Sequence, residues 1–191
     1  MNYQLFKIVN SFAGRMDWFD DVMEIFAQDI VWLLLALLVT LWIIGTKEDQ
    51  RSVFYACLSA GIALLLASLL ISPEVNQARP FVSHTVHQLI PHSADPSFPS
   101  DHSTLAFSLA FSVLFINRKW GLAAFGLACL TGVARVYVGV HYPGDIIGAG
   151  ALSFIICVSV FLSRSWLQPL PDFFIRINER LIAVLPGKRK G

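Results

Sequence analysis

Long apolar runs separated by short polar stretches occupy most of the chain, and five of them predict helices that cross a membrane. A helix needs roughly 20 mainly apolar residues to cross about 30 Å of hydrocarbon. The third run is short, so its helix is expected to begin within Pro99–Thr104 and to keep that polar end inside the protein. The five predicted spans are Val22–Ile44, Val53–Ile71, Ser103–Ile116, Gly121–Val138 and Ile146–Leu162.

The two ends of the chain have a different pattern, in which apolar and charged residues alternate. This pattern extends over Met1–Asp21 and again over Asp172–Leu185. It is typical of an amphipathic helix that lies on the membrane surface. Neither segment is expected to cross the membrane.

Composition supports a membrane protein. Of the 191 residues, 55% are hydrophobic and 14% are charged, against roughly 45–50% and 25% in soluble domains. A net charge of +1 gives no footprint for nucleic-acid binding. The three cysteines lie in apolar runs as small hydrophobes, so they predict neither a disulfide nor a metal site. We therefore predict an all-α fold, a polytopic membrane helical bundle with about five transmembrane helices plus interfacial helices, and a single domain over residues 1–191.

The positions of lysine and arginine predict the orientation, because cytoplasmic loops collect these residues. In a five-span layout, one side holds Lys47, Arg51, Arg118, Lys119, Arg164, Arg176, Arg180, Lys188, Arg189 and Lys190. The other side holds Lys7, Arg15, Arg79, Arg135 and every histidine of the chain. The polar chemistry is therefore expected at the outer face of the membrane.

One cluster of chemically active residues lies where the fourth span ends. A guanidinium at membrane depth costs several kcal/mol unless it is paired, so an anion is expected beside Arg135. His141 and Asp145 follow at the same boundary, separated by a short turn. A carboxylate that accepts one ring N–H of a histidine leaves the other ring nitrogen as a nucleophile or a base.

A second cluster, Pro99–His102, lies where the third span is expected to begin. The amino end of a helix binds anions through free backbone N–H groups, Ser100 adds a hydroxyl donor, and His102 is placed to transfer a proton. Arg79, followed by a proline, supplies a further guanidinium suited to phosphate oxygens. The clusters together predict a phosphate site.

These motifs, in this order and at this spacing, resemble those of the type 2 phosphatidic acid phosphatase superfamily of membrane phosphatases. The resemblance extends from Arg79 to Asp145. The stretch Arg79–His92 is similar, more narrowly, to the undecaprenyl-diphosphate phosphatases associated with bacitracin resistance. The chain departs from the superfamily pattern at three positions that concern head-group contacts: Ser72 replaces a lysine, Asp101 a glycine and Ala134 a serine.

The resemblance implies a mechanism without a metal or other cofactor. His141 would attack the terminal phosphorus to give a phosphohistidine, while Asp145 orients its ring and His102 protonates the leaving group and then activates water. The implied phosphate-binding residues are Arg79, Arg135 and Ser100. The implied substrate is a prenyl diphosphate lipid, undecaprenyl diphosphate, in a bacterial plasma membrane with the active site facing outside. Its hydrolysis would recycle the cell-wall lipid carrier and lower bacitracin sensitivity.

Several alternatives remain open from the sequence. Three further histidines, His84, His87 and His92, are candidates for a lid or a head-group contact, whereas zinc is a weaker interpretation because their loop adds only Asp95 as a ligand. Phosphatidic acid or phosphatidylglycerophosphate is the alternative substrate. A transporter with an intramembrane anion site is the non-enzyme alternative, although no inverted repeat is visible. Membrane lipids, and no nucleic acid, are the expected partners, and the oligomeric state is open.

Overall fold

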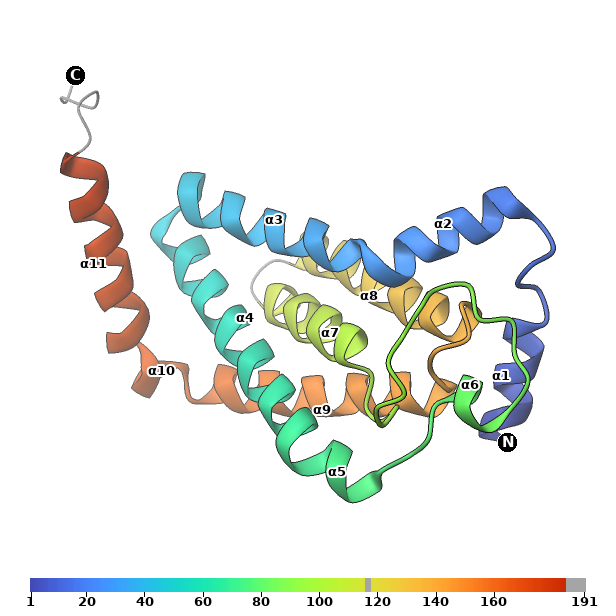
Figure 1. Cartoon of the computed structure of the whole chain (residues 1–191). Coiled ribbons are helices and arrows are strands. Elements are labelled where there is room, and N and C mark those ends of the chain that lie inside the picture. The colour runs from blue at the N-terminus through green and yellow to red at the C-terminus, as the bar shows by residue number, and fades with distance from the viewer. Residues whose placement is uncertain (116–117, 185–191) are drawn as a thin grey trace.

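The computed structural model describes residues 1–115 and 118–184, and helices make up most of this part of the chain (Figure 1). The first half contains α1 (Asn2–Asn10), α2 (Asp17–Gln28), α3 (Ile30–Ile44), α4 (Lys47–Leu66), the π-helical turn η1 (Ala67–Ile71), α5 (Ser72–Val75) and α6 (Pro80–Ser83). The second half contains α7 (Asp101–Leu114), α8 (Arg118–Tyr137), α9 (Pro143–Leu162), α10 (Arg164–Leu167) and α11 (Pro169–Val184). The described residues form no strand, which confirms the all-α prediction.

Three segments of the described chain are long and apolar enough to cross a membrane: Lys47–Ser83, α8 and α9. The helices α2 and α3 make a fourth span if they count as one, although they are bent by 47°. The short helix α7 has 14 residues and does not pass on length. Length and composition therefore support three or four spans in the described residues, against about five predicted.

The difference lies in α7, the third predicted span. It packs against α4, α8 and α9, which shield it from lipid, so a short helix can lie at membrane depth. Its amino end begins at Asp101, within the polar stretch as predicted, and the Ser100 side chain caps it by accepting a hydrogen bond from the backbone N–H of Ser103 at 3.4 Å. Ile116, the predicted end, lies outside the described residues.

The surface helix predicted over Met1–Asp21 is interrupted. The helix α1 ends at Asn10 and α2 begins at Asp17, with Gly14 at φ +75° in the turn between them. The Asp20 carboxylate accepts hydrogen bonds from the Gly14 backbone N–H at 3.1 and 3.2 Å and closes this turn. The alternation of apolar and charged residues over Met1–Asp21 therefore belongs to two helices, not to one. At the other end, α11 begins three residues before the predicted Asp172, and Leu185 and Lys188–Lys190 lie outside the described residues.

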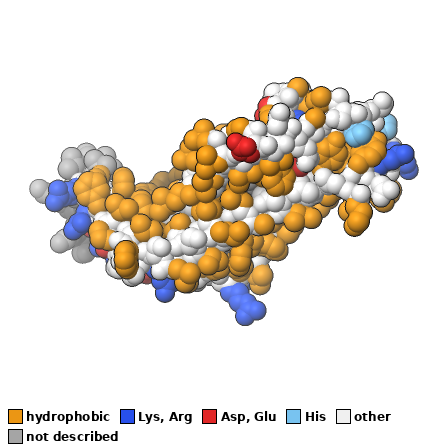
Figure 2. All heavy atoms as spheres, turned by 90° about the horizontal axis from the view of Figure 1, so that it is seen from below, with side chains coloured by type: hydrophobic (Ala, Val, Ile, Leu, Met, Phe, Trp, Pro, Cys, Tyr) orange, Lys and Arg blue, Asp and Glu red, His pale blue; other side chains and the backbone are white. Residues whose placement is uncertain are grey.

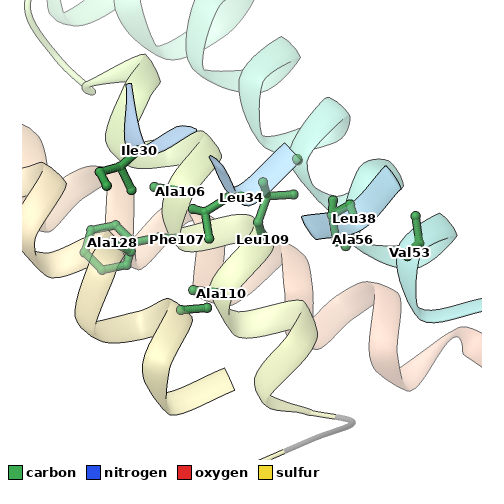
Figure 3. Close-up of a cluster of buried hydrophobic side chains, with 12 residues drawn as sticks. Ile30, Leu34, Leu38, Val53, Ala56, Ala106, Phe107, Leu109, Ala110 and Ala128 are labelled. Carbon is green, nitrogen blue, oxygen red and sulfur yellow. The ribbon is translucent and has the colours of Figure 1, made fainter. Parts of the chain in front are cut away.

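The main apolar core lies between α3, α4, α7 and α8 (Figure 3). Ile30, Leu34 and Leu38 face it from α3 at a spacing of four residues, which places them on one side of that helix. Small side chains, among them Ala56 on α4 and Ala110 on α7, allow the helix backbones to approach closely.

A second kind of contact joins α7 to α9. The Ser108 hydroxyl donates to the Ser153 hydroxyl at 3.0 Å, and the Ser153 hydroxyl donates to the Thr104 carbonyl at 2.9 Å. One turn further along, the Cys157 thiol donates to the Ser108 carbonyl at 3.3 Å. These buried polar groups are therefore bonded inside the protein rather than exposed to lipid.

The connections that carry the histidines and those that carry most of the lysines and arginines lie at opposite ends of the bundle. Figure 1 shows the amino ends of α7 and α9 directed towards the end of the bundle that carries α1 and α6, whereas α10 and α11 lie at the far end. Hydrophobic side chains cover much of the face in Figure 2, and histidines appear at one end of it. At the far end, Arg51 pairs with Asp172 at 2.9 Å and Lys47 with Glu179 at 2.7 Å, so basic residues of α4 gather there with α11.

Gly139, two residues after the end of α8, has a conformation that favours glycine, because its φ is +88°. A Cβ atom at this position would lie 2.7 Å from the His87 carbonyl oxygen, a backbone atom. We expect Gly139→Ala to lower the free energy of unfolding by about 1–3 kcal/mol, measured as a fall in the thermal unfolding temperature in detergent. Gly61→Ala in α4 is the matched control, since a Cβ there would meet no atom within 4 Å beyond its chain neighbours and the backbone of its own helix. Equal thermal stability of the two variants would contradict this account.

Candidate active site

Residues far apart in the sequence meet where the amino ends of α7 and α9 approach the carboxyl end of α8. Five of the predicted site residues are buried there: Arg79, Ser100, Arg135, His141 and Asp145. Arg135 lies in the last turn of α8, Asp145 lies in the first turn of α9, and the turn between these helices carries His141. The sequence motifs therefore converge at one end of the bundle.

The hydrogen bonds of His141 fix its tautomer. Its Nδ1 lies 3.3 Å from Oδ2 of Asp145, and a carboxylate can only accept, so Nδ1 carries the hydrogen. Its Nε2 faces nitrogens of two guanidinium groups, Arg79 Nη1 at 3.0 Å and Arg135 Nη2 at 3.4 Å, and guanidinium nitrogens only donate. The lone pair of His141 is therefore on Nε2 and points at the two arginines.

The charge state of His141 agrees with this tautomer. Burial, followed by the positive charges of Arg135 and Arg79, lowers the pKa of His141 well below its ordinary value. The ring is consequently neutral at neutral pH. A neutral imidazole with a free Nε2 is the form that can act as a nucleophile.

Two arginines surround the position in front of His141 Nε2. Arg135 donates to the Ala27 carbonyl at 3.5 Å, and its buried Nε has no hydrogen-bond partner among the described residues. A buried donor without a partner is costly, so this guanidinium is suited to receive an anion. The arrangement can thus bind phosphate oxygens against the nitrogen that would attack phosphorus.

Arg79 has a second role, because it also holds the long loop that leads to α7. Its Nε donates to the carbonyl and to Oδ1 of Asp95, at 3.0 and 3.2 Å. Its Nη1 donates to the Val140 carbonyl at 3.1 Å, directly beside His141. Arg79 therefore ties the loop, the α8–α9 turn and the candidate nucleophile together.

Gln77 is a site residue that the sequence analysis missed. Its Nε2 donates to Oδ1 of Asp145 at 2.9 Å and to the Ser97 hydroxyl at 3.1 Å. The other carboxylate oxygen accepts from the backbone N–H of Tyr142 at 2.8 Å. Both oxygens of Asp145 are thus held in place. The only signal in the sequence was a polar residue close to Arg79.

His102 and Ser100 lie at the amino end of α7. His102 is partly exposed, and the charges of Arg135, His92 and Arg79 act on its ring. The same three residues act on His141, so the two histidines share one electrostatic environment. The Ser100 hydroxyl caps α7 and still has its own hydrogen to donate.

The three other histidines separate in space. His84 stacks on Tyr3 of α1, with ring centroids 3.8 Å apart, and His87 is bonded through its backbone to α1. His92 alone lies against His141, with ring centroids 6.0 Å apart and the rings edge to face. Of the loop histidines, the structure brings His92 to the site.

Asn10, also missed from the sequence, fixes α1 to this end of the bundle. Its side-chain amide donates to the carbonyls of His87 at 2.7 Å and of Tyr137 at 2.8 Å, and its oxygen accepts from the His87 backbone N–H at 3.0 Å. It is buried, unlike most residues of α1. The amino-terminal helix therefore supports both the loop and the end of α8.

Comparison with known proteins places these residues in a family context. Residues 52–169 match the model of the PAP2 superfamily. The chain is 39% identical over 190 residues to the undecaprenyl-diphosphatase BcrC of Bacillus subtilis, covering 98% of this chain and 97% of that protein. It is 31% identical to the putative undecaprenyl-diphosphatase YbjG of Escherichia coli, covering 83% of this chain and 80% of that protein.

Solved structures agree on the fold. The crystal structure of Aquifex aeolicus LpxE superposes with a TM-score of 0.68 at 25% identity, over 84% of this chain and 94% of that chain. A PAP2-type phosphatidylglycerolphosphate phosphatase from Bacillus subtilis gives a TM-score of 0.60 at 22% identity, over 88% and 87%, and supports the fold alone. From the family match and the near full-length similarity, the chain belongs to the PAP2 superfamily, whose motifs its sequence resembles.

Proposed function

We propose that the chain hydrolyses undecaprenyl diphosphate to undecaprenyl phosphate and inorganic phosphate. The observation that carries this proposal is the unprotonated Nε2 of His141, which faces two guanidinium groups at 3.0 and 3.4 Å while Asp145 holds Nδ1. A nucleophile with donors in front of it is what in-line phosphoryl transfer requires. The 39% identity to an undecaprenyl-diphosphatase over 98% of the chain supports the choice of lipid.

In the first step, Nε2 of His141 attacks the terminal phosphorus. The bond from that phosphorus to the bridging oxygen breaks, and His102, which binds a proton when the negative charge of the diphosphate offsets the charges of Arg79 and Arg135, gives that proton to the departing undecaprenyl phosphate. Asp145 stabilises the positive charge that develops on the ring. Arg79, Arg135 and the backbone N–H groups at the start of α7 hold the phosphoryl oxygens, and most of the rate enhancement is expected from this fixed positive field.

In the second step, water releases the phosphate. His102, now without its proton, takes a proton from a water molecule, which attacks the phosphorus of the phosphohistidine. The phosphorus–nitrogen bond breaks, the electron pair returns to Nε2 of His141, and inorganic phosphate leaves. Both histidines are then in their starting states.

The proposed location is the outer face of a bacterial plasma membrane. Support comes from the charge distribution: Arg51 of α4 and Arg164 of α10 lie at the end of the bundle away from the site, where the Tyr55 hydroxyl donates to the Arg164 carbonyl at 3.1 Å. Loops rich in lysine and arginine remain in the cytoplasm. The end that carries His141 would then face outside.

The test is a phosphatase assay of the purified chain in detergent with three lipids. We expect kcat/KM for undecaprenyl diphosphate to exceed that for phosphatidic acid and phosphatidylglycerophosphate by about tenfold or more, with inorganic phosphate release as the readout. Vanadate, an analogue of the phosphate being transferred, should inhibit all three reactions. A higher kcat/KM on either glycerophospholipid would overturn the proposed substrate.

A further inference from the structure

His92 is the one loop histidine that reaches the site, and its surroundings hold the ring in place. Its Nδ1 lies 3.2 Å from the Ser93 carbonyl and 3.7 Å from Oδ1 of Asp95. That carboxylate in turn accepts from the Ser93 hydroxyl at 2.6 Å and from Arg79 Nε at 3.2 Å. The ring is therefore linked through Asp95 to the arginine that contacts His141.

These contacts determine which nitrogen of His92 is available. A carbonyl oxygen only accepts, so Nδ1 carries a hydrogen, and Nε2 makes no hydrogen bond with the described residues. The His92 side chain is 19% exposed, so the ring is partly accessible. His92 is thus a polar group with one free nitrogen beside the candidate nucleophile.

A diphosphate places more charge in the site than a monophosphate. The two guanidinium groups within contact distance of His141, from Arg79 and Arg135, both point at Nε2, where the terminal phosphate is expected. The superfamily's lysine is replaced by Ser72, at the start of α5. A second phosphate, joined to the first by one bridging oxygen, therefore needs a donor from elsewhere.

We propose that Nε2 of His92 contacts the second phosphate of a bound diphosphate, and so makes the site favour diphosphate over monophosphate lipids. This inference rests on the proposed function. The His92 ring is close enough to reach the second phosphate, because its centroid is 6.0 Å from that of His141 and one bridging oxygen separates the two phosphorus atoms of the diphosphate. Nε2 can accept a hydrogen bond from a protonated phosphate oxygen or, once it binds a proton, donate to an ionised one.

The charges around His92 favour a ring that is neutral in the empty site and binds a proton when a phosphate arrives. Burial and the charge of Arg79 lower the pKa of His92, so the ring is neutral before the lipid binds. An arriving phosphate opposes both influences and favours the imidazolium. Asp95, whose own pKa falls because hydrogen bonds from Ser93 and Arg79 outweigh the opposing effect of its partial burial, stays ionised and stabilises that charge.

The experiment compares two lipids that differ by one phosphate, farnesyl diphosphate and farnesyl monophosphate, with the full chain in detergent. We expect His92→Ala to lower kcat/KM for the diphosphate by about tenfold to 100-fold and for the monophosphate by less than about threefold. His92→Gln, which keeps a polar group but gains no charge, should fall between. Gln88→Ala, an exposed position in the same loop, is the control and should change neither value.

The outcomes separate the two proposals. Equal loss on both lipids, or no loss on either, would overturn the role of His92 while wild-type hydrolysis of undecaprenyl diphosphate upholds the proposed function. A wild-type chain inactive on all prenyl phosphates would overturn both. Size-exclusion profiles and unfolding temperatures equal to wild type ensure that a loss in His92→Ala or His92→Gln reflects lost contact rather than lost fold.

Discussion

Replacing His141 with alanine is expected to reduce hydrolysis of undecaprenyl diphosphate on the order of 10⁴-fold or more. The substitution removes the ring that contacts Asp145 through Nδ1 and both guanidinium groups through Nε2. Residual activity should come from the remaining positive field acting on water. Steady-state phosphate release measures this effect.

A second readout distinguishes a nucleophile from a residue that only shapes the site. Wild-type protein, quenched during turnover of substrate labelled in the terminal phosphate, should carry acid-labile label on the chain, as a phosphohistidine does. His141→Ala should carry none. Thr40→Ala, on the exposed side of α3, is a control that should behave as wild type. Label retained in His141→Ala would show that phosphate is transferred to another residue, and wild-type protein without label would contradict a phosphohistidine intermediate.

Arg79→Lys is expected to give the second largest loss, about 10²-fold to 10³-fold in kcat/KM. Arginine here uses all three nitrogens, towards Asp95, Pro96, Val140 and His141. A lysine keeps the charge but has one nitrogen, so it cannot hold the loop and face Nε2 of His141 together.

The matched control for Arg79→Lys is Arg15→Lys. Arg15 is exposed, lies over the Phe12 ring, and is predicted to be on the same side of the membrane as Arg79. It should leave kcat/KM unchanged. Wild-type activity in Arg79→Lys would show that charge alone, without the planar fork of donors, is sufficient at this position.

Much of the site could be predicted because charged residues in apolar surroundings are costly and therefore conspicuous. Arg135, His141 and Asp145 stood out at the end of an apolar run, and the structure places them in one cluster. Their partners could not be predicted in the same way. Gln77 reaches Asp145 across 68 positions of sequence, and Asn10 reaches Tyr137 across 127, so no local spacing indicates these partners.

The spans illustrate another limit of sequence patterns. Average hydropathy located α8 and α9 to within three residues at each end, because the middle of each helix is apolar and its charged residues lie near the ends. It could not reveal that Val22–Ile44 is broken at Asp29 into α2 and α3, which differ in direction by 47°. The bend occurs at a single residue, Asp29, whose backbone N–H still donates to the Ile25 carbonyl, so it changes the direction of the helix but hardly changes the mean hydropathy of the segment.

The serine and cysteine contacts between α7 and α9 have a consequence for behaviour in different membranes. Apolar side chains can slide past one another at little cost, whereas hydrogen bonds at 2.9–3.3 Å between Ser108, Ser153, Thr104 and Cys157 permit one axial alignment of the two helices. Bilayers of unequal thickness tilt or strain individual helices. With the pair locked in register, the depth of His102 relative to Asp145 should stay constant from thin to thick bilayers.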